Sequence, residues 1–333
     1  MSLPSIQRVL LQSIAAADPE GHFVEVDNIQ AYYKIAIPQH HQILLQNQQP
    51  LPYEPHKPVI LCLHHFLGNQ YTWKFLMQPL ADATGCHVIA YDRVAFGFTE
   101  RPVQWEEGKN PYTQPAAVEF AVQLLVQLGY GTKKVVFVGC SAGAAISCSV
   151  AIRYPDLVHS LILIGPSLKP DDQGPPPVAR HILGSASGRL FLKAILYRYL
   201  PFPTLYHDIN SISEWETVVK PCNRVPLTLP NFYEAVSLLM KYFIPLEILP
   251  NKHVVQRYPI LYITGDDDKY LHVDKHKEAF DELVAGAPEN AVIEYYVLES
   301  CGHLPQDEKP QETLELVINF LRKLGVYSEN RCA

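Results

Sequence analysis

Short apolar runs rich in β-branched residues alternate with longer segments of helical periodicity through the first half of the chain. Runs of this kind are typical of buried strands, and their alternation with helices is typical of a mostly parallel sheet. The pattern predicts, in order, strand 59–63, helix 73–83, strand 87–91, helix 116–128, strand 135–138 and strand 161–164. We therefore expect an α/β fold in which a mostly parallel central β-sheet carries helices on both faces.

The residues before this alternation follow another pattern. Two β-rich runs, 23–26 and 29–36, flank an Asp-Asn pair at 27–28 and are predicted to form an antiparallel hairpin. The segment 6–17 has the periodicity of a short helix. Polar residues with Gln and Pro dominate 39–57, which predicts a surface insertion.

The alternation stops after the strand at 161–164. From 169 to about 255 the pattern predicts helices at 188–200, 211–220 and 231–243. This segment is rich in aromatic residues, which are Phe191, Tyr197, Tyr199, Phe202, Tyr206, Trp215, Phe232, Tyr233, Tyr242 and Phe243. We expect most of them to pack the segment against the rest of the protein and a few to line an apolar pocket.

Strands resume at 258–265 and 291–298. The chain is therefore divided into the first part of an α/β core at 1–168, a mainly helical insertion at 169–256 and the second part of the core at 257–333. A length of 333 residues is sufficient for one large α/β domain with such an insertion.

Composition and charge exclude several classes of protein. Apolar residues make up 48% of the chain and charged residues 18%, which is ordinary for a globular enzyme. The net charge of −7 argues against binding to nucleic acid, and the sequence holds no apolar stretch long enough for an integral membrane protein. The first residues lack the charged start and sustained apolar run of a signal peptide.

The seven cysteines are odd in number, scattered and without a C-x-x-C pair. Cys62, Cys140 and Cys148 lie on predicted core elements, where a free thiol behaves as a small hydrophobe, and we expect Cys301 to be a packed neighbour of His303. This usage indicates a reducing compartment, so we expect a cytoplasmic location, with organelle targeting left open. Because the fourteen histidines show no H-E-x-x-H or comparable spacing, we expect no metal and no cofactor.

The most informative motif is G-C-S-A-G at 139–143, which stands between the predicted strand 135–138 and a run of small apolar residues that can form a helix. In this context G-x-S-x-G places its serine on a sharp strand-to-helix turn, with Oγ exposed above the sheet edge. Free N–H groups at the helix N-terminus favour negative charge there. Ser141 is therefore the candidate nucleophile, and the alternative is a tight turn with a solvated serine.

A serine nucleophile needs a base, and the base needs an orienting acid. Both follow later strands. Three aspartates at 266–268 come directly after the strand 258–265, and His303 comes after the strand 291–298.

The order Ser141, Asp268, His303 and the five motifs that the chain contains resemble the α/β-hydrolase superfamily over most of the chain. The motifs are L-H-H-F-L-G at 63–68, D-R-V-A-F-G-F-T-E-R-P at 92–102, G-C-S-A-G at 139–143, G-D-D-D at 265–268 and G-H-L-P-Q-D-E-K-P at 302–310. The resemblance implies an α/β-hydrolase fold whose insertion is a mainly helical cap. It also implies a catalytic triad of Ser141, Asp268 and His303 and an oxyanion hole formed by the backbone N–H groups of Phe66 and Ala142.

The oxyanion segment departs from the superfamily pattern. Where that pattern has glycine, this chain has His65, which is either a polar contact to the substrate or a tolerated structural substitution. Backbone donors do not depend on side-chain identity, so the oxyanion hole can survive the change. We expect His64 to be an internal hydrogen-bonding residue beneath the loop.

The acid has more than one candidate position. Three adjacent carboxylates cannot all be buried and ionised cheaply, so Asp266 and Asp267 are assigned to exposed positions of the turn and Asp268 matches the superfamily spacing. Asp171 or Asp172, after an earlier strand, is a rival position.

The resemblance implies a serine hydrolase that works without a cofactor. We expect it to cleave a carboxylic ester or lactone of a small to medium apolar substrate, with C–C bond and thioester hydrolysis left open. A serine at the nucleophile position argues against epoxide hydrolase and haloalkane dehalogenase chemistry, which use an aspartate there. A ligand-binding signal receptor that retains the triad is the alternative from another class, and a homodimer stays open.

Overall fold

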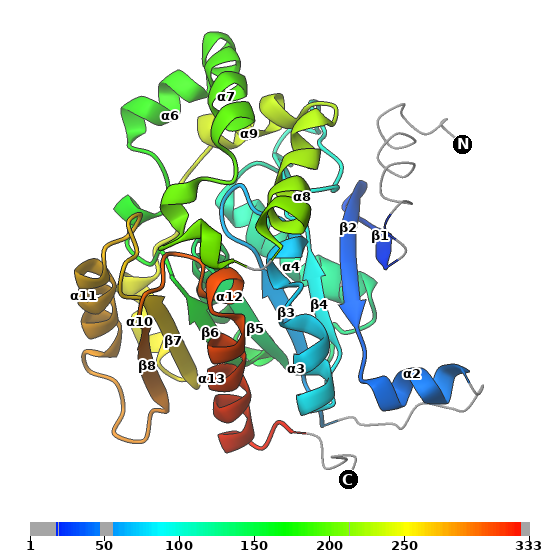
Figure 1. Ribbon diagram of the computed structural model, residues 1–333, viewed down its shortest axis with the longest axis vertical. Helices are drawn as coiled ribbons and strands as arrows, with labels where there is room; N and C mark the ends of the chain where they lie inside the picture. Colours follow the sequence, from blue (N-terminus) through cyan, green and yellow to red (C-terminus); the bar gives the residue numbers. More distant parts are fainter. Residues whose placement is uncertain (1–17, 19, 47–55, 213, 328–333) are drawn as a thin grey trace.

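The computed structural model describes residues 18, 20–46, 56–212 and 214–327. Within them, eight strands form one sheet (Figure 1). In chain order the strands are β1 (Gly21–Val26), β2 (Ile29–Ala36), β3 (Val59–Leu63), β4 (Val88–Tyr91), β5 (Val135–Cys140), β6 (Val158–Ile164), β7 (Ile260–Gly265) and β8 (Ile293–Leu298). Their order in space is β1-β2-β4-β3-β5-β6-β7-β8, and all pairings from β4 onward are parallel. The predicted mostly parallel sheet is confirmed.

The sheet begins with an antiparallel hairpin, as the sequence predicts. β1 pairs with β2, and β2 pairs antiparallel with β4. Asp27 and Asn28 connect the two strands with φ angles of 49° and 64°. Two successive left-handed residues match the right-handed twist of the flanking strands, and Asp and Asn tolerate this conformation better than most residues.

The segment after the hairpin, which the sequence predicts to be a polar surface insertion, contains a helix that the sequence analysis did not predict. Its first part forms a helix, α2 (Gln39–Gln46), and the Gln39 N–H donates to Asp82 Oδ1 at 2.7 Å. Asp82 belongs to another helix, so a tertiary contact fixes the start of α2. Residues 47–55 and the predicted helix at 6–17 lie outside the described residues.

Helices cover both faces of the sheet. On one face lie α4 (Gln114–Gln127), α5 (Ala142–Arg153) and α11 (Val273–Val284). On the other face lie α3 (Met77–Thr84) and α13 (Pro310–Lys323), which also contact each other. The prediction of helices on both faces is therefore confirmed.

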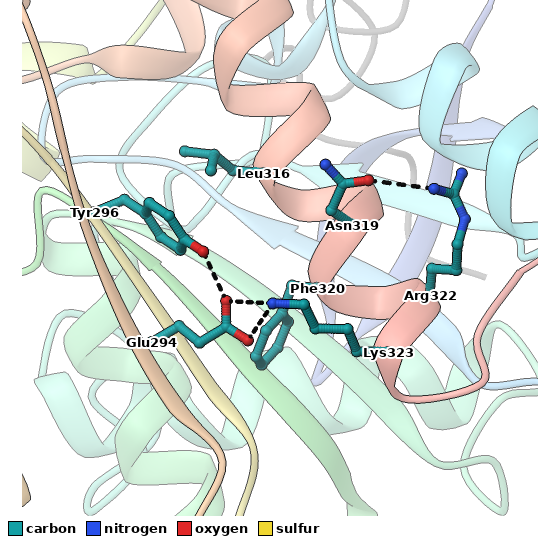
Figure 2. A pocket seen from close by; sticks show the side chains of 7 residues that line it. All are labelled: Glu294, Tyr296, Leu316, Asn319, Phe320, Arg322 and Lys323. Atoms are coloured by element: carbon teal, nitrogen blue, oxygen red, sulfur yellow. Dashed lines mark hydrogen bonds and ion pairs between the residues drawn. The ribbon is translucent and has the colours of Figure 1, made fainter.

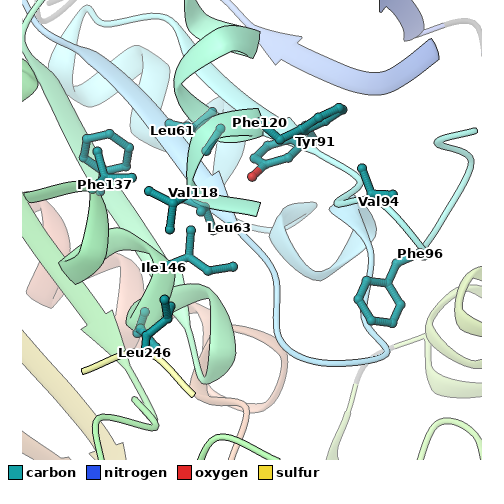
Figure 3. Close-up of a cluster of buried hydrophobic side chains, with 14 of the residues drawn as sticks. Leu61, Leu63, Tyr91, Val94, Phe96, Val118, Phe120, Phe137, Ile146 and Leu246 are labelled. Atoms are coloured by element: carbon teal, nitrogen blue, oxygen red, sulfur yellow. The ribbon is translucent and has the colours of Figure 1, made fainter. Parts of the chain in front are cut away.

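Strand residues alternate between the two faces with the two-residue period of a β-strand. In β3, Leu61 and Leu63 belong to the hydrophobic cluster under α4 and α5, whereas Ile60 and Cys62 belong to the cluster under α3 and α13. Figure 3 shows the first cluster, in which Ile146 of α5 lies among strand side chains. Each fully buried aliphatic side chain stabilises the fold by about 1.5–3 kcal/mol, so both layers hold the strand ends rigidly.

Between β6 and β7 the chain is mainly helical. The α-helices of this insertion are α6 (Pro177–Leu183), α7 (Ala186–Tyr199), α8 (Lys220–Arg224), α9 (Phe232–Lys241) and α10 (Lys252–Val255). The predicted helices at 188–200 and 231–243 correspond to α7 and α9. Figure 1 shows α6 and α7 at the top of the molecule, above the sheet. Phe232 and Val236 of α9 reach the core cluster that α4 and α5 cover.

The predicted helix at 211–220 is wrong as an α-helix. Its first residues are the end of a 3-10 turn, Ile209–Ser211, and Trp215–Val219 is a π-helical turn. Glu214 has a φ of 60°, and the Val219 N–H donates to the Glu214 carbonyl five residues earlier. Pro221 has no N–H to continue a regular α-helical ladder, which accounts for the irregular turn before it.

The parallel strands β3, β5, β7 and β8 end at the same edge of the sheet. Ligand sites of open α/β sheets form outside the carboxyl ends of the strands, because the loops there converge. The loops after these four strands carry Phe66, Ser141, Asp268 and His303, respectively.

Candidate active site

Ser141 occupies the turn between β5 and α5. Its φ of 53° and ψ of −116° lie in a region that non-glycine residues rarely adopt. Gly139 and Gly143 make the turn possible: a Cβ on Gly139 would lie 2.5 Å from Ala144 Cα, and one on Gly143 would overlap the Leu63 carbonyl oxygen. The strained turn places Ser141 at the N-terminus of α5, where free N–H groups favour negative charge.

A line of hydrogen bonds connects Ser141, His303 and Asp268. Ser141 Oγ lies 2.9 Å from His303 Nε2, and His303 Nδ1 lies 2.6 Å from Asp268 Oδ2. Because a carboxylate can only accept, Nδ1 donates to Asp268 and Nε2 is left to accept the proton of the serine hydroxyl. The structure thus brings together the three residues in the geometry of a nucleophile, a base and an orienting acid.

Asp268 accepts four hydrogen bonds. Its Oδ1 accepts from the Tyr270 and Leu271 backbone N–H groups at 2.9 and 2.8 Å. Its Oδ2 accepts from His303 and also from His276 Nε2 at 3.0 Å. Burial opposes ionisation of this carboxyl, but the hydrogen bonds from His276 and His303 prevail and hold its pKa below the usual range. Asp268 is therefore a buried, charged and firmly oriented group.

The sequence interpretation did not include His276. This residue lies on α11, fully buried, and its Nδ1 is 3.0 Å from the Tyr262 hydroxyl of β7. The available signal is a histidine eight residues after Asp268, on the helix that follows the acid. His272 precedes the same helix and is largely exposed, so the sequence gives no means to tell the two histidines apart.

The other candidate acids lie elsewhere. Asp266 is exposed, and Asp267 pairs with His207 at 2.8 Å on the outer side of the turn. Asp172 lies 3.8 Å from Lys275. In the described structure, none of these three carboxylates hydrogen-bonds to the histidine beside Ser141.

The two predicted oxyanion donors lie on neighbouring segments. Ala142 is the first residue of α5, so its N–H has no partner within the helix. Phe66 follows β3, and its loop touches α5 because Gly143 packs against the carbonyl groups of Leu63 and His64. Neither the Phe66 nor the Ala142 N–H donates to an acceptor in the described parts of the chain. Both amides are therefore free to stabilise a developing oxyanion.

His64 is satisfied within the loop. Its Nδ1 donates to the His65 carbonyl oxygen at 2.7 Å, and its Nε2 accepts from the Arg93 backbone N–H at 3.0 Å. Desolvation by burial moves the pKa of His64 well below its ordinary value, so the ring is neutral. These bonds give it the internal place that the sequence analysis expects.

His65 packs differently from its neighbour. Its Nδ1 donates to the Phe66 carbonyl oxygen at 2.9 Å, and burial lowers its pKa to about 3. A Cβ on Gly68 would lie 2.6 Å from its Nε2, so the glycine makes room for this ring. Among the described residues, Nε2 makes no hydrogen bond, and it remains an acceptor beside the oxyanion segment.

A buried cation supports the same segment. Arg93 donates from its guanidinium to the His65 carbonyl oxygen at 3.0 Å and lies over the ring of Phe96. Desolvation lowers the pKa of Arg93 to about 10, so it keeps its positive charge at neutral pH. That charge favours a negative oxygen in its surroundings.

Asp268, His276 and His303 also have the spacing of a metal site. One ligand atom from each lies within 4.8 Å of the others. However, both imidazoles donate to Asp268, and a metal would require those nitrogens to lose their protons. The group fits a chain of hydrogen bonds better than a metal centre.

A hollow of about 420 Å³ lies between β8 and α13 (Figure 2). Its main charged groups satisfy one another, because Glu294 pairs with Lys323 at 2.8 Å and accepts from the Tyr296 hydroxyl at 3.0 Å. None of the residues around Ser141 lines it. Ser141 itself is buried, with 4% of its surface exposed.

The aromatic residues of the insertion fall into several groups. Phe191 and Tyr197 of α7 are exposed. Tyr206 and Phe232 are buried, and Tyr206 packs edge-on against Trp215. The remaining half-buried aromatic residues include Tyr233, Tyr242 and Phe243.

All six cysteines of the described residues are free thiols, and Cys301 is buried beside His303. Burial raises the pKa of Cys301, so it is an unreactive neighbour. None of the helices in the described part combines the length and apolar character that a membrane crossing requires.

Known proteins show the same fold. The family described as alpha/beta hydrolase fold matches residues 58–310. Epoxide hydrolase 3 of Xenopus tropicalis is 24% identical over 288 residues, which cover 80% of this chain and 72% of that protein. A 2-hydroxymuconate semialdehyde hydrolase of Pseudomonas putida is 28% identical over 241 residues, covering 70% and 76%. The crystal structure of the enol-lactonase from Burkholderia xenovorans LB400 has a TM-score of 0.67 at 18% identity, covering 90% and 100%. The chain belongs to the α/β hydrolase fold family.

Proposed function

We propose that this chain is a serine hydrolase that cleaves a carboxylic ester or lactone of a small to medium apolar substrate. The observation that carries the proposal is the line of hydrogen bonds from Ser141 through His303 to Asp268, with lengths of 2.9 and 2.6 Å. It lies where the loops of four parallel strands converge, and it needs no cofactor.

The first half of the reaction forms an acyl-serine. Ser141 Oγ attacks the carbonyl carbon while its proton passes to His303 Nε2. Asp268 stabilises the resulting imidazolium through its bond to Nδ1, and the N–H groups of Phe66 and Ala142 hold the carbonyl oxygen as it becomes negative. His303 then returns the proton to the leaving alkoxide, which departs as an alcohol.

The second half releases the acid. A water molecule gives its proton to His303 and attacks the acyl carbon, again with the oxyanion held by backbone N–H groups. When the tetrahedral intermediate collapses, the proton returns to Ser141 Oγ and the carboxylic acid leaves. A lactone yields one hydroxy acid instead of two products.

The insertion at 169–256 acts as a lid and selectivity filter in this proposal. Ser141 is buried, whereas the predicted triad and oxyanion donors all come from outside the insertion. Movement of the lid would admit substrate and then exclude water. His65, with a free Nε2 beside the oxyanion segment, would accept a hydrogen bond from a polar group of the substrate.

A C–C bond hydrolase is the second candidate, because one relative is named a 2-hydroxymuconate semialdehyde hydrolase. The same serine, base and oxyanion donors serve that reaction. The relative named epoxide hydrolase supports a different chemistry, but the residue at the strand-to-helix turn here is Ser141. Serine suits acyl transfer rather than displacement at an epoxide carbon.

The decisive experiment is labelling with a fluorophosphonate, followed by mass spectrometry of the labelled peptide. The label should fall on Ser141, and the protein should turn over members of a panel of p-nitrophenyl esters and simple lactones. A panel of meta-cleavage-type diketone substrates tests the second candidate. Labelling of another residue, or none at all, would refute serine catalysis. Labelling with tight product or ligand retention and very slow turnover would favour a receptor.

A further inference from the structure

We propose that His276 is a positioning residue that shares the Asp268 carboxylate with His303 and thereby extends the activity of the enzyme to lower pH. This inference rests on the proposed function, because it concerns how the base beside Ser141 is tuned. Two imidazoles converge on one oxygen, since Asp268 Oδ2 accepts from His303 at 2.6 Å and from His276 at 3.0 Å. The second imidazole is not needed for the relay itself.

The hydrogen bonds define the protonation state of His276. Its Nε2 must donate, because a carboxylate only accepts. The Tyr262 hydroxyl lies 3.0 Å from its Nδ1 and 3.3 Å from the His276 carbonyl oxygen, and in the neutral ring Nδ1 accepts the hydroxyl proton through the shorter contact. Desolvation is the largest influence on this ring and lowers the pKa of His276 despite the nearby carboxylate. His276 is therefore a neutral donor over the working range of the enzyme.

Four groups on neighbouring segments act on His276. They are Tyr262 on β7, Asp268 and His303 on the loops after β7 and β8, and Asp172, which lies 3.8 Å from Lys275. Asp172 favours a charged imidazole, and burial raises its own pKa. The full burial of His276 outweighs this attraction.

The consequence for His303 follows from how the charge of Asp268 is divided. When His303 takes the proton of Ser141, its imidazolium is stabilised by the carboxylate. A hydrogen bond from His276 to the same oxygen draws negative charge toward the second ring, which weakens that stabilisation. In this proposal, activity therefore extends to lower pH than it would without the His276 hydrogen bond.

The same bond fixes the direction of the carboxylate. Tyr270 and Leu271 hold Oδ1 through their backbone N–H groups, but Oδ2 has no backbone donor among the described residues. Without His276, backbone donors would hold only Oδ1 of Asp268, and the donor left to Oδ2 would be His303, the base that the carboxylate must orient. A purely structural role for His276 would contribute stability but would not change how activity depends on pH.

The test is the pH profile of kcat/KM for four variants alongside the native enzyme. His276→Phe removes the donor and fills similar space, and His276→Gln restores an N–H donor without an ionisable ring. Tyr262→Phe removes the group that fixes the tautomer. His87→Phe is the matched control, because His87 Nδ1 bonds the Tyr130 hydroxyl at 2.7 Å at the opposite end of the strands.

We expect His276→Phe to move the acidic limb of the profile up by about 0.5–1 pH unit and to lower kcat by about 10-fold. His276→Gln should return most of the limb to its native position, Tyr262→Phe should move it slightly upward, and His87→Phe should leave it in place. Thermal unfolding of each variant shows whether it is folded.

Three results would overturn the inference. A limb that stays in place in folded His276→Phe assigns His276 a structural role, and equal shifts in His276→Phe and His87→Phe indicate an unspecific effect. If His276→Phe does not fold, the other two variants decide. A native acidic limb in His276→Gln together with an upward shift in Tyr262→Phe supports sharing of the carboxylate. Any other combination of results in these two variants refutes it. Fluorophosphonate labelling of native Ser141 separates these results from failure of the proposed function.

Discussion

The sheet core and the insertion between β6 and β7 differ in how firmly their residues are held. Nine residues of α5, directly behind Ser141, are buried, whereas α6 has none and α7 has three. Regions with few buried apolar contacts open at lower free-energy cost than core elements. The difference teaches that the candidate chemistry lies on well-packed strand ends, whereas α6 and α7 are the loosely packed part of an insertion whose helix α9 has six buried residues.

The ends of the insertion are tied together, which limits how it can move. Gln173 near its start is buried and makes two hydrogen bonds to Leu246 near its end, from Nε2 to the carbonyl at 2.7 Å and from the Leu246 N–H to Oε1 at 2.6 Å. Farther out, contacts such as the Arg189–Glu234 ion pair at 2.6 Å are partly exposed. An insertion whose ends are joined by buried hydrogen bonds and whose outer contacts are partly exposed fits the proposed lid, because its outer helices can move while the core stays in place.

The largest effect expected from the core is that of Ser141→Ala. Removal of the nucleophile should lower kcat by about 10⁴- to 10⁶-fold while the protein stays folded, because Ala fits the same space. Ser167→Ala is the control, since Ser167 Oγ lies 3.3 Å from Ser141 Oγ but outside the relay. Ester hydrolysis measured for both variants checks this. Near-native activity of Ser141→Ala would mean that another residue is the nucleophile. The assignment of the chemistry to the core would then lose its basis.

The second effect concerns the acid. Asp268→Asn should lower kcat by about 10⁴-fold, because an amide disturbs the tautomer of His303. Asp172→Asn tests the rival carboxylate at the start of the insertion and should cost far less. Steady-state kinetics on one ester compare the two. A greater loss in Asp172→Asn would move an essential group into the insertion.

The sequence predicted the core better than the insertion, for a physical reason. Buried strands such as β3 and β5 can be recognised from apolar runs rich in β-branched residues. The loops that follow parallel strands meet at the same edge of the sheet. The positions of Ser141, Asp268 and His303 at one sheet edge could therefore be anticipated. Helices α7 and α9 could be found from periodicity, but their relation to the site could not.

What the sequence could not predict depends on tertiary contacts. α2 is a polar, Gln-rich segment whose first N–H donates to Asp82 of another helix. The local sequence pattern cannot predict this hydrogen bond between distant residues. His276 is a partner of the acid only because α11 packs against β7. The turn before Pro221 is distorted by that proline, and the prediction of a regular helix overlooked its missing donor.

A third effect lies where the core meets the insertion, at Asp307. Its Oδ2 accepts from Thr72 of the core at 3.3 Å and from Tyr206 of the insertion at 3.4 Å, and burial raises its pKa to about 7. An unfolded aspartate has a pKa of about 4. Between these values the folded state holds a proton that the unfolded state releases, so the free energy of unfolding falls as pH rises from about 4 to 7.

Asp307→Asn keeps the neutral form and should remove this fall, which stabilises the variant relative to native by on the order of 2–4 kcal/mol at pH 8. Urea unfolding at several pH values between 4 and 8 measures it. Asp171→Asn, at an exposed carboxylate of the insertion, is the control and should follow the native curve. Parallel curves for native and Asp307→Asn would show that this carboxyl is not protonated in the folded state.

The smallest effect is expected from the insertion, and it separates selectivity from chemistry. Tyr233, Tyr242 and Phe243 are half-buried around α9, and Ala substitution of one that lines the pocket should change the ranking of substrates by roughly 10- to 200-fold. Tyr197→Ala, at a side chain that is 63% exposed, should leave the ranking unchanged. Competition between ester substrates of different acyl size measures the ranking.

Fluorophosphonate labelling of Ser141 should persist in all of these variants, because the relay and the oxyanion donors belong to the core. A variant that changes the ranking of substrates but keeps its labelling shows that the two regions act independently. Loss of labelling in a folded variant of Tyr233, Tyr242 or Phe243 would place an essential catalytic group in the insertion. An unchanged ranking in the Tyr233, Tyr242 and Phe243 variants would leave the specificity of the enzyme to core residues such as His65, and the insertion would then only cover the site.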